Sequence, residues 1–573
     1  MKYTSLAIFI ISLITSCQSP DGKSEKSDDH KWWKEAIVYQ LYPRSFKDSD
    51  GDGIGDLKGI ISQLDYIKSL DVDVVWLNPI YTSPNYDNGY DISDYRTIMT
   101  EFGTMADFDS LLQGLHKRNI KLLMDMVVNH SSSEHEWFKQ ARSSRNNPYR
   151  DYYHWWPAEK GKPTPRFSFF DINGDAWKYD SLTNSYYLHY FAEQQPDLNW
   201  ENSKVREEIY AIMKFWADKG IDGFRLDAFQ YAAKDTAFPI LPLEYEKNIA
   251  KYYGMQPQLH TYLAEMNREV FSKYDLMTVA EGAGSTFADA HALVDANRNE
   301  LNMAYHFDAI DIGKEVGSYN LLDFKRVYTK WDSAFASDGW LSIYLANHDN
   351  ARMVSRFGNE SEEFRDKSST MLTTFIMTMR GTPYYYYGDE LGMTNIRFNT
   401  IEDYRDIETL NKYEKIKNEG GDLEKFIETQ KRVARDNGRT PFQWNKTSNA
   451  GFTTGLPWLK VNSNYQNVNM MTQDKDAKSV LNYFRAAVKL RKENSVLVYG
   501  KYTLVDKDNR DVYAYTREQN GVKILVMLNF KSTPATTNIG INLQKADVLL
   551  GNYSNASVDG NLKSYEAVVY KLN

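Results

Sequence analysis

The 573-residue sequence has a single cysteine, no apolar run long enough to cross a membrane as a helix, and no excess of basic residues. With one cysteine, a disulfide within the chain is excluded, so stability must come from the core. A spanning helix needs an apolar run of about 18 residues or more. The 68 lysine and arginine residues are outnumbered by 77 aspartate and glutamate residues, which gives a net charge of −9. This balance argues against a general nucleic-acid partner, because phosphates require a basic surface.

Aromatic residues are the feature that the sequence has in quantity: they make up 14% of the chain, with 41 tyrosines and 13 tryptophans. The hydrophobic content of 42% and the charged content of 25% are ordinary for a soluble globular protein. The length suggests more than one domain. Aromatic rings suit the faces of sugars, but they also fill cores, so composition leaves both uses open.

The first residues have the pattern of an export signal. An apolar run over residues 6–14 is too short for a membrane helix and ends in LITSC, which resembles a bacterial lipoprotein box. We therefore expect a lipoprotein signal peptide over 1–16, a lipid on Cys17 and a flexible polar tether over 17–30. The protein would then be anchored in a bacterial cell envelope, on its periplasmic or cell-surface side. A plain secretory peptide with an incidental cysteine is the alternative.

Beyond residue 30, short apolar runs alternate with segments whose apolar residues recur at helical spacing. Residues 56–71 form one such helical segment, and residues 203–220 form another behind a predicted Asn202 cap. Strands that alternate with helices imply a parallel sheet, and eight such units imply a (β/α)₈ barrel. The eight expected strands lie in AIVYQLYP, VDVVWLNPI, IKLLMDMVVNH, IDGFRLDAF, LMTVAEG, LNMAYHFD, LSIYLANHDN and TPYYYYGDE.

One of these runs, GIDGFRLDAFQ, carries two charges inside an apolar strand pattern. Arg225 and Asp227 are two residues apart and therefore project from the same face of a strand. A structural ion pair is one interpretation, since buried charges must be paired. The other is an active site, because polar residues also end the neighbouring runs, and barrel sites are built at the carboxyl ends of several strands. These residues are Asp125, Asn129, His130, Glu281, Asn347, His348 and Asp349.

Four of the runs also resemble known signature regions. DMVVNH, GFRLDAF, TVAEG and LANHDN, in this order, are similar to the four signature regions of the α-amylase superfamily of glycoside hydrolases. QPDLNW, ELNMAYHFD and RDNGRTPFQW resemble the α-glucosidase and oligo-1,6-glucosidase branch of that superfamily. The resemblance extends from about Trp32 to the C-terminus.

The resemblance implies catalytic roles for three carboxylates. Retaining cleavage of a glycosidic bond needs a carboxylate nucleophile and a carboxylic acid about 5–5.5 Å apart. Asp227 matches the nucleophile, Glu281 the general acid/base, and Asp349 the carboxylate that stabilises the transition state. Arg225 would keep Asp227 ionised and oriented.

Further matches concern substrate binding. His130 and His348 match the two histidines that form hydrogen bonds to the sugar in the −1 subsite. In the motif SPNYDNGYDISDY, Tyr90 matches a tyrosine that stacks under the terminal glucose, and Asp87 matches an aspartate that pairs with the arginine matched by Arg435. A pocket capped in this way implies action on chain ends, whereas an α-amylase needs an open cleft.

The segment DSDGDGIGD, after the first expected strand, places oxygen ligands at alternate positions, with Gly53 at the sharp turn. This spacing suits a hard cation. The twelfth position is Gly59 instead of the bidentate glutamate of an EF-hand, which disfavours a calcium sensor. We expect a structural Ca²⁺ or Mg²⁺, as the resemblance implies; an acidic solvated turn is the alternative. The expected ligands are Asp48, Asp50, Asp52, Asp56 and the carbonyl of Ile54.

The expected barrel is interrupted and extended. We expect the catalytic barrel over 31–130 and 201–495, a small B domain over 131–200, and a C-terminal antiparallel β domain over 496–573. Residues 163–180, PTPRFSFFDINGDAWKYD, lack the Pro-Asn-Asn-Trp that is usual in the branch. Because the B domain walls the pocket in this family, this departure bears on acceptor preference.

The sequence therefore predicts a retaining exo-acting α-glucosidase that releases glucose from the non-reducing ends of short α-glucans, with α-1,4 linkages preferred. The linkage prediction depends on Ala228, because α-1,6-cleaving relatives usually carry valine at this position. An endo-acting amylase or neopullulanase and an oligo-1,6-glucosidase or transglycosylase are alternatives within the fold. A non-catalytic protein like the transporter heavy chains of this fold is a third. We expect an oligosaccharide substrate and contact with a membrane only through the lipid anchor; the oligomeric state stays open.

The anchor can be tested directly. Replacing Cys17 by serine should release the protein from the membrane fraction of its bacterial host, because the lipid on Cys17 would be the tether. Fractionation followed by immunodetection measures the change, with the wild type as control. Unchanged membrane attachment of the Cys17→Ser variant would reject the lipoprotein interpretation.

Overall fold

The structure, a computed structural model, describes residues 30–172, 174–312 and 319–573. The predicted signal peptide, Cys17 and the tether up to residue 29 lie outside these ranges. None of the helices in the described ranges is long and apolar enough to cross a membrane.

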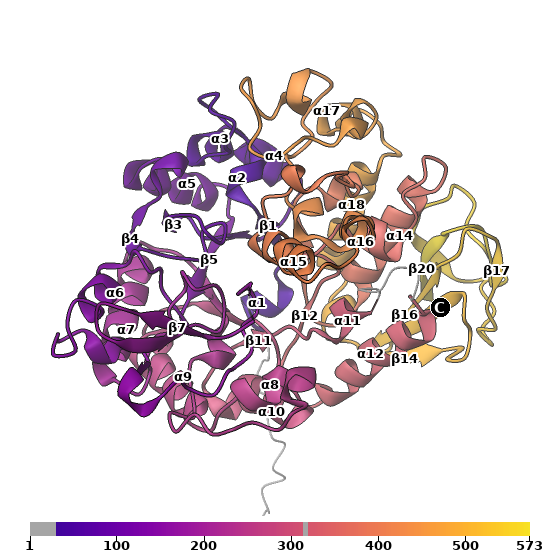
Figure 1. Cartoon of the computed structure of the whole chain (residues 1–573). Helices are drawn as coiled ribbons and strands as arrows, with labels where there is room; N and C mark the ends of the chain where they lie inside the picture. The colour runs from indigo at the N-terminus through magenta and orange to yellow at the C-terminus, as the bar shows by residue number, and fades with distance from the viewer. Residues whose placement is uncertain (1–29, 173, 313–318) are drawn as a thin grey trace, which may run out of the picture.

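Eight parallel strands form the central sheet, in the order β11-β10-β9-β5-β2-β1-β13-β12 (Figure 1). A single parallel bridge between Ala304 and Leu341 joins its two ends, so the sheet is almost closed into a barrel. Each of the eight apolar runs supplies one strand, and the predicted barrel fold is confirmed. The strands are β1 (Val38–Leu41), β2 (Val74–Leu77), β5 (Lys121–Val127), β9 (Gly223–Asp227), β10 (Met277–Ala280), β11 (Met303–Ala304), β12 (Ser342–Ile343) and β13 (Thr382–Tyr386).

Close backbone approach explains the glycine that begins β9. A Cβ at Gly223 would lie 2.2 Å from the carbonyl oxygen of Met277 on β10 and 2.8 Å from the side chain of Leu123 on β5. Both neighbours are fixed in the sheet, so only glycine allows β9 to fit between β5 and β10. These three adjacent strands carry Asp125, Arg225 and Asp227.

Helices surround the sheet (Figure 1), and many of their apolar side chains are buried in the core. The side chain of Asn202 caps the second predicted helix by accepting a hydrogen bond from the Lys204 N–H at 3.0 Å. The segment 56–71 is not one helix but two, because Gln63 leaves the helical conformation at φ −113° and ψ 13°. The longer helices are α5 (Met105–His116), α7 (Ser203–Asp218), α9 (Gln258–Glu269), α12 (Leu321–Ala334), α14 (Arg365–Thr378) and α18 (Val480–Glu493), and the two pieces of 56–71 are α3 (Leu57–Ser62) and α4 (Leu64–Ser69).

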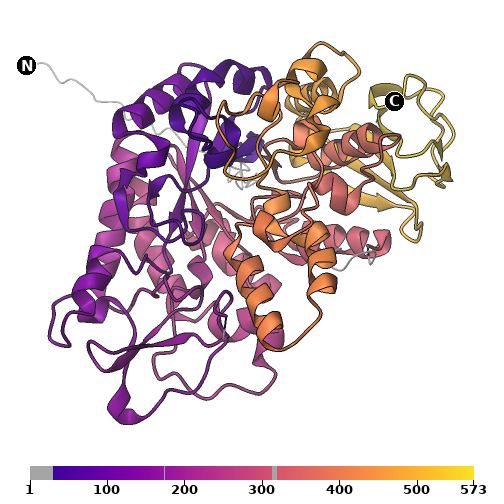
Figure 2. The same ribbon diagram turned by 45° about the horizontal axis from the view of Figure 1, so that its top comes forward.

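Two excursions rise from the same end of the barrel (Figure 2). The first, residues 131–200, follows β5 and contains a small antiparallel sheet in the order β6-β8-β7. The second follows β13 and contains a pair of helices. Their elements are β6 (Trp155–Pro157), β7 (Trp177–Asp180) and β8 (Ser185–Leu188), and α15 (Ile407–Asn418) and α16 (Leu423–Val433).

The chain ends in a five-stranded antiparallel sheet beside the barrel (Figure 1). A short helix, α19 (Val496–Tyr499), precedes it. At the junction, the buried guanidinium of Arg491 donates to the carbonyls of Met377, Met379 and Gly381 at 2.6–2.9 Å. Arg491 belongs to α18, while Arg517 of the sheet donates to the carbonyl of Thr378 and joins the sheet to the backbone that leads into β13. Its strands are β14 (Lys501–Val505), β15 (Val512–Gln519), β16 (Val522–Asn529), β18 (Asp547–Gly551) and β20 (Ala567–Leu572).

Candidate active site

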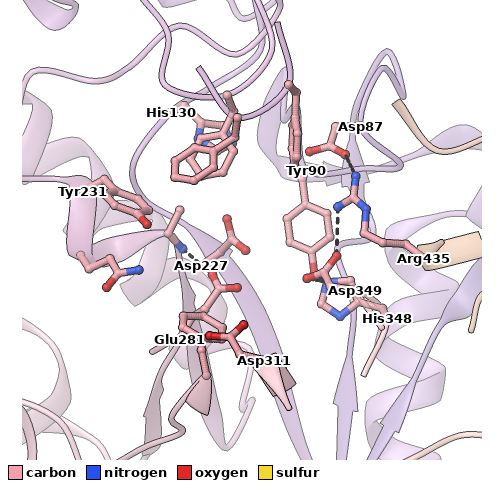
Figure 3. Close-up of a pocket in the computed structure, with 16 residues that line it drawn as sticks. Asp87, Tyr90, His130, Asp227, Tyr231, Glu281, Asp311, His348, Asp349 and Arg435 are labelled. Atoms are coloured by element: carbon pink, nitrogen blue, oxygen red, sulfur yellow. Dashed lines mark hydrogen bonds and ion pairs between the residues drawn. The ribbon is translucent and has the colours of Figure 1, made fainter. Parts of the chain in front are cut away.

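A cavity of about 380 Å³ opens at the carboxyl ends of the barrel strands (Figure 3). Nine of the ten residues predicted for catalysis or substrate binding line it, and the tenth, Arg225, lies buried behind them. Polar groups from the strand ends form its floor, and aromatic side chains from the excursions form its walls. The lining residues are Asp87, Tyr90, His130, Phe169, Phe170, Phe191, Asp227, Ala228, Gln230, Tyr231, Glu281, Phe307, Asp311, His348, Asp349 and Arg435.

Arg225 is the centre of the floor. Its guanidinium is fully buried and contacts three carboxylates: Asp125 Oδ1 at 2.8 Å, Glu281 Oε1 at 2.7 Å, and Asp227. It also donates to the hydroxyl of Tyr305 at 2.9 Å. The structure therefore answers the question raised by the charged pair in β9: Arg225 is shared by carboxylates from three adjacent strands and is more than a local partner of Asp227.

The surroundings of Asp227 disfavour its ionised form. Burial, and next the negative charge of Glu281, raise the pKa of Asp227 well above its usual range, although Arg225 opposes the shift. The backbone N–H of Ala228 donates to Glu281 Oε2 at 2.8 Å, so the two carboxylates are connected through the chain as well as through Arg225. Two carboxylates that share one guanidinium in this way repel each other when both are ionised.

Tyr90 and His348 form a stacked pair at one side of the floor. Their rings are 5.2 Å apart and inclined by only 7°, and the Tyr90 hydroxyl lies 2.7 Å from His348 Nε2 and 2.9 Å from Asp125 Oδ2. Burial lowers the pKa of His348 to about 3, so the imidazole is neutral at physiological pH. One face of Tyr90 is thus occupied by His348, while the residue still lines the cavity.

His130 lies across the cavity at the end of β5. Its Nε2 is 3.1 Å from Gln195 Nε2, and its Nδ1 is 3.2 Å from Asn129 Nδ2. Burial lowers the pKa of His130 to about 3, which makes this imidazole neutral too. Gln195 also donates to Asp87 Oδ2 at 3.0 Å and thereby connects His130 to the other end of the cavity.

Arg435 reaches the cavity from the excursion after β13. Its guanidinium contacts Asp349 Oδ1 at 3.0 Å and Asp406 Oδ1 at 2.5 Å, and it lies 3.7 Å from Asp87 Oδ1. Glu408 Oε2 lies 3.6 Å from its Nε, so the predicted pairing of Arg435 with Asp87 is the longest of four carboxylate contacts. Burial raises the pKa of Asp87 to about 7, and Arg435 opposes that shift. The sequence did not indicate Asp406 as a partner of Arg435, because Asp406 stands before α15 among other polar residues and belongs to none of the recognised motifs.

Asp349 is held in its ionised form. Burial by itself would raise the pKa of Asp349, but His348 and the guanidinium groups of Arg435 and Arg439 lower it below its usual range. Since the imidazole is neutral, the two arginines provide the stabilising charge. Arg439 Nη2 lies 3.1 Å from Asp349 Oδ1. The sequence could have indicated Arg439, which is the second arginine of RDNGRTP, the motif that led to Arg435.

The sequence analysis did not identify the individual phenylalanines that form the walls of the cavity. Phe169, Phe170 and Phe191 come from the excursion 131–200, and the ring of Phe170 lies 4.9 Å from the guanidinium carbon of Arg435. Two of these phenylalanines lie in the stretch that departs from the branch pattern. Tyr231 and Phe307 complete the wall near Glu281.

The acidic loop after β1 gathers some of its predicted ligands. Carboxylate oxygens of Asp48, Asp50 and Asp56 lie within 4.8 Å of one another. Asp52 is not part of this group, and its carboxylate accepts a hydrogen bond from the Ile54 N–H at 2.7 Å. The Asp56 side chain also caps α3 through the Gly59 N–H at 2.7 Å. The loop thus concentrates three carboxylates at the start of the first helix.

Comparison with known proteins matches residues 40–500 to the catalytic domain of alpha amylase. The chain is 48% identical over 558 residues to an oligo-1,6-glucosidase of Parageobacillus thermoglucosidasius, covering 94% of this chain and 99% of that protein. It is 47% identical to an oligo-1,6-glucosidase of Bacillus cereus, covering 95% of this chain and all of that protein.

Solved structures agree with the sequence comparison. The isomaltulose synthase of Klebsiella sp. LX3 superposes with a TM-score of 0.92 at 44% sequence identity, covering 95% of this chain and all of that one. The match spans the barrel, the excursions and the C-terminal sheet. On the family model, the relatives and the fold together, the chain belongs to the α-amylase family of glycoside hydrolases.

Proposed function

We propose that the protein is a retaining, exo-acting α-glucosidase that removes single glucose units from the non-reducing ends of short α-glucans. The observation that supports this function most directly is the position of Asp227 and Glu281 on the two terminal nitrogens of one guanidinium, Arg225. Two carboxylates that bind the same guanidinium lie close together. Such closeness is typical of retaining enzymes, whereas in inverting enzymes the two catalytic carboxylates are farther apart and hold a water molecule between them and the sugar.

In this mechanism Asp227 attacks the anomeric carbon and forms a glucosyl–enzyme intermediate, while Glu281 protonates the departing glycosidic oxygen. Glu281 then takes a proton from the water that hydrolyses the intermediate. The first step needs an ionised Asp227 and a protonated Glu281, and the guanidinium of Arg225 beside Asp227 favours the ionised nucleophile. Asp349, kept ionised by Arg435 and Arg439, would bind sugar hydroxyls and stabilise positive charge on the ring in the transition state.

Exo action is supported by unfilled hydrogen-bonding capacity at the inner end of the cavity. Asp87 Oδ1 is buried and has no hydrogen-bond partner in the described part of the chain, although Arg435 lies 3.7 Å away. A buried acceptor of this kind is costly unless a ligand satisfies it. A terminal glucose hydroxyl would donate to Asp87, and this contact would hold the non-reducing end of the substrate here.

We propose a preference for α-1,4 linkages on the basis of Ala228, which lines the cavity beside Glu281. A small side chain leaves room for the next sugar close to the floor. α-1,6 hydrolysis, or transfer to a sugar acceptor, is the second candidate, favoured by relatives named oligo-1,6-glucosidase and isomaltulose synthase. Maltose, isomaltose and sucrose as substrates, with product analysis, separate the two candidates.

We also propose that the loop carboxylates of Asp48, Asp50 and Asp56 hold a structural Ca²⁺ or Mg²⁺. Oxygen donors of this type and closeness fit a hard cation. The ammonium group of Lys47, the adjacent cation in the sequence, donates to the carbonyls of Gly451 and Phe452 at 3.0 Å. The carboxylates of Asp48 and Asp56 accept hydrogen bonds from backbone N–H groups of the loop and of α3. When bound, the ion would neutralise the loop and stabilise the first βα connection; it takes no part in catalysis.

The catalytic pair is tested by isosteric substitution. Asp227→Asn and Glu281→Gln should each lower kcat by at least about 10³-fold on maltose, because each removes a complete chemical role. Asp125→Asn is a matched control: it removes another carboxylate from Arg225 but none from the cavity lining. We expect a smaller loss for this control, and wild-type turnover in either of the first two variants would exclude the assignment.

Linkage preference is tested at Ala228. The wild type should show a higher kcat/KM for maltose than for isomaltose, and Ala228→Val should shift the ratio toward isomaltose by roughly ten- to a hundredfold. Ala228 has φ +47°, where a β-branched residue is strained, so the total activity of this variant should also fall. Ala228→Ser, small and unbranched, should leave the ratio near that of the wild type. A wild type that prefers isomaltose would contradict the α-1,4 proposal.

The cation is tested by chelation. Treatment with a chelator should lower the melting temperature, and Ca²⁺ or Mg²⁺ should restore it, because a ligand that binds only the folded state stabilises it. In Asp50→Asn the shift should be smaller, since one ligand charge is lost. Metal analysis that finds no ion in the untreated protein would contradict the proposal.

A further inference from the structure

Lys234, seven residues after Asp227, has a fully buried ammonium group. Its Nζ donates to the carbonyl oxygen of Tyr231 at 2.7 Å and to Asn129 Oδ1 at 3.0 Å, and it lies 3.1 Å from Asp197 Oδ2. An ammonium group has three N–H donors, and these three oxygens lie within reach of them. The ring of Tyr190, 5.2 Å from Nζ, covers another side.

The three acceptor oxygens belong to three different parts of the molecule. Asn129 lies just beyond the end of β5, Asp197 lies near the end of the excursion 131–200, and Tyr231 ends the 3₁₀ helix that follows β9 (Phe229–Tyr231). Asn129 and the end of the excursion are also joined directly, since the Leu198 N–H donates to the Asn129 carbonyl at 2.8 Å and the Asn129 amide donates to Asp197 Oδ1 at 3.2 Å. Lys234 adds Tyr231, from the segment after β9, to this contact. Lys234 therefore fastens the excursion to the two barrel strands between which the catalytic floor is formed.

Each acceptor is also next to the cavity. Asn129 is adjacent to His130, and Tyr231 lines the cavity itself. Asp197 is two residues after Gln195, whose amide nitrogen lies 3.1 Å from His130 Nε2 and 3.0 Å from Asp87 Oδ2. A displacement of any acceptor would therefore move a cavity wall.

Lys234 also determines the orientation of the Asn129 amide. Because an ammonium group can only donate, Asn129 must present its oxygen to it. The amide nitrogen then faces Asp197 Oδ1 at 3.2 Å and His130 Nδ1 at 3.2 Å. One buried charge thus fixes a side chain that contacts the imidazole of His130.

We propose that Lys234 is a positioning residue for the hydrolytic reaction: it holds the excursion 131–200 against the barrel and sets the His130–Gln195 wall of the cavity, without contacting the substrate. The proposal rests on the proposed glucosidase function, whose binding pocket this wall would form. A misplacement of about 1 Å in such a wall can cost up to about 10²-fold in rate.

A purely structural role must be separated from positioning, because removal of a buried charge also lowers stability. Lys234→Met leaves Asp197 buried without its cation, which is strongly destabilising. The double variant Lys234→Met with Asp197→Asn removes both charges and should recover most of the lost melting temperature. It keeps the Asp197 oxygen that accepts from Asn129 and from the Tyr190 N–H.

Lys325 is a matched control. It is also buried, at 1% exposure, and its ammonium group donates to the carbonyls of Asn509 at 2.7 Å and Asp506 at 3.3 Å, where α12 meets the C-terminal sheet. None of these residues lines the cavity. Lys325→Met should lower the melting temperature and leave kcat/KM unchanged.

The experiment measures kcat and KM on p-nitrophenyl α-glucoside, melting temperature, and hydrogen–deuterium exchange in residues 187–200, each variant being assayed at the same interval below its own melting temperature. We expect the double variant to lose roughly 10- to 100-fold in kcat/KM and to exchange faster over 187–200, while Lys325→Met changes neither. Lys234→Arg, which keeps the charge, should recover part of the activity.

Wild-type kcat/KM and wild-type exchange in the double variant would overturn the proposal, and so would an equal loss of kcat/KM in Lys325→Met. The exchange measurement does not depend on turnover. A wild type that fails to cleave the glucoside would therefore refute the proposed function, while the exchange over 187–200 would still decide whether Lys234 holds the excursion in place.

Discussion

The buried guanidinium of Arg225 contacts three carboxylates, and both the barrel and the cavity depend on that contact. Asp125, Asp227 and Glu281 meet it from three adjacent strands or strand ends. In the β5–β9 ladder Asp125 pairs directly with Arg225. A slip of β9 by one residue would turn Arg225 and Asp227 to the opposite face of the sheet, where their charges would be buried without partners. The contacts of Arg225 therefore fix the register of β9 and assemble the catalytic site at the same time.

The excursions give this charged floor its shape. The excursion 131–200 brings phenylalanine rings over it, and the one after β13 brings Arg435, which contacts Asp87, Asp349 and Asp406. Asp349 is ionised because arginines from outside the barrel surround it. The strands thus provide the reacting groups, and the connections between elements provide the surroundings that set their charge, as is usual for barrel enzymes.

Most of the barrel could be predicted because its signals are local. Short apolar runs become buried strands, and an Asn202 side chain before a helical pattern becomes a cap. The helix predicted over 56–71 was wrong in one respect, since its apolar stripe continues through Gln63 although the backbone does not. A Cβ at Gly59 would lie 1.9 Å from the Lys47 carbonyl oxygen, so α3 is held tightly against the loop before it. Periodicity contains no information about that contact.

The sequence by itself determined the order of strands and helices and the polar residues that end each strand, because apolar periodicity and strand-end position are properties of neighbours along the chain. Only the tertiary structure decided the partners of those residues. Asp406 and Arg435 belong to the excursion after β13, and Lys234 and Asp197 are 37 residues apart, as the residue numbers show. Their charges are stabilised by distant groups that folding brings within 4 Å. Coulombic and hydrogen-bonding interactions act through space, so their partners follow from the fold and cannot be read from spacing in the sequence.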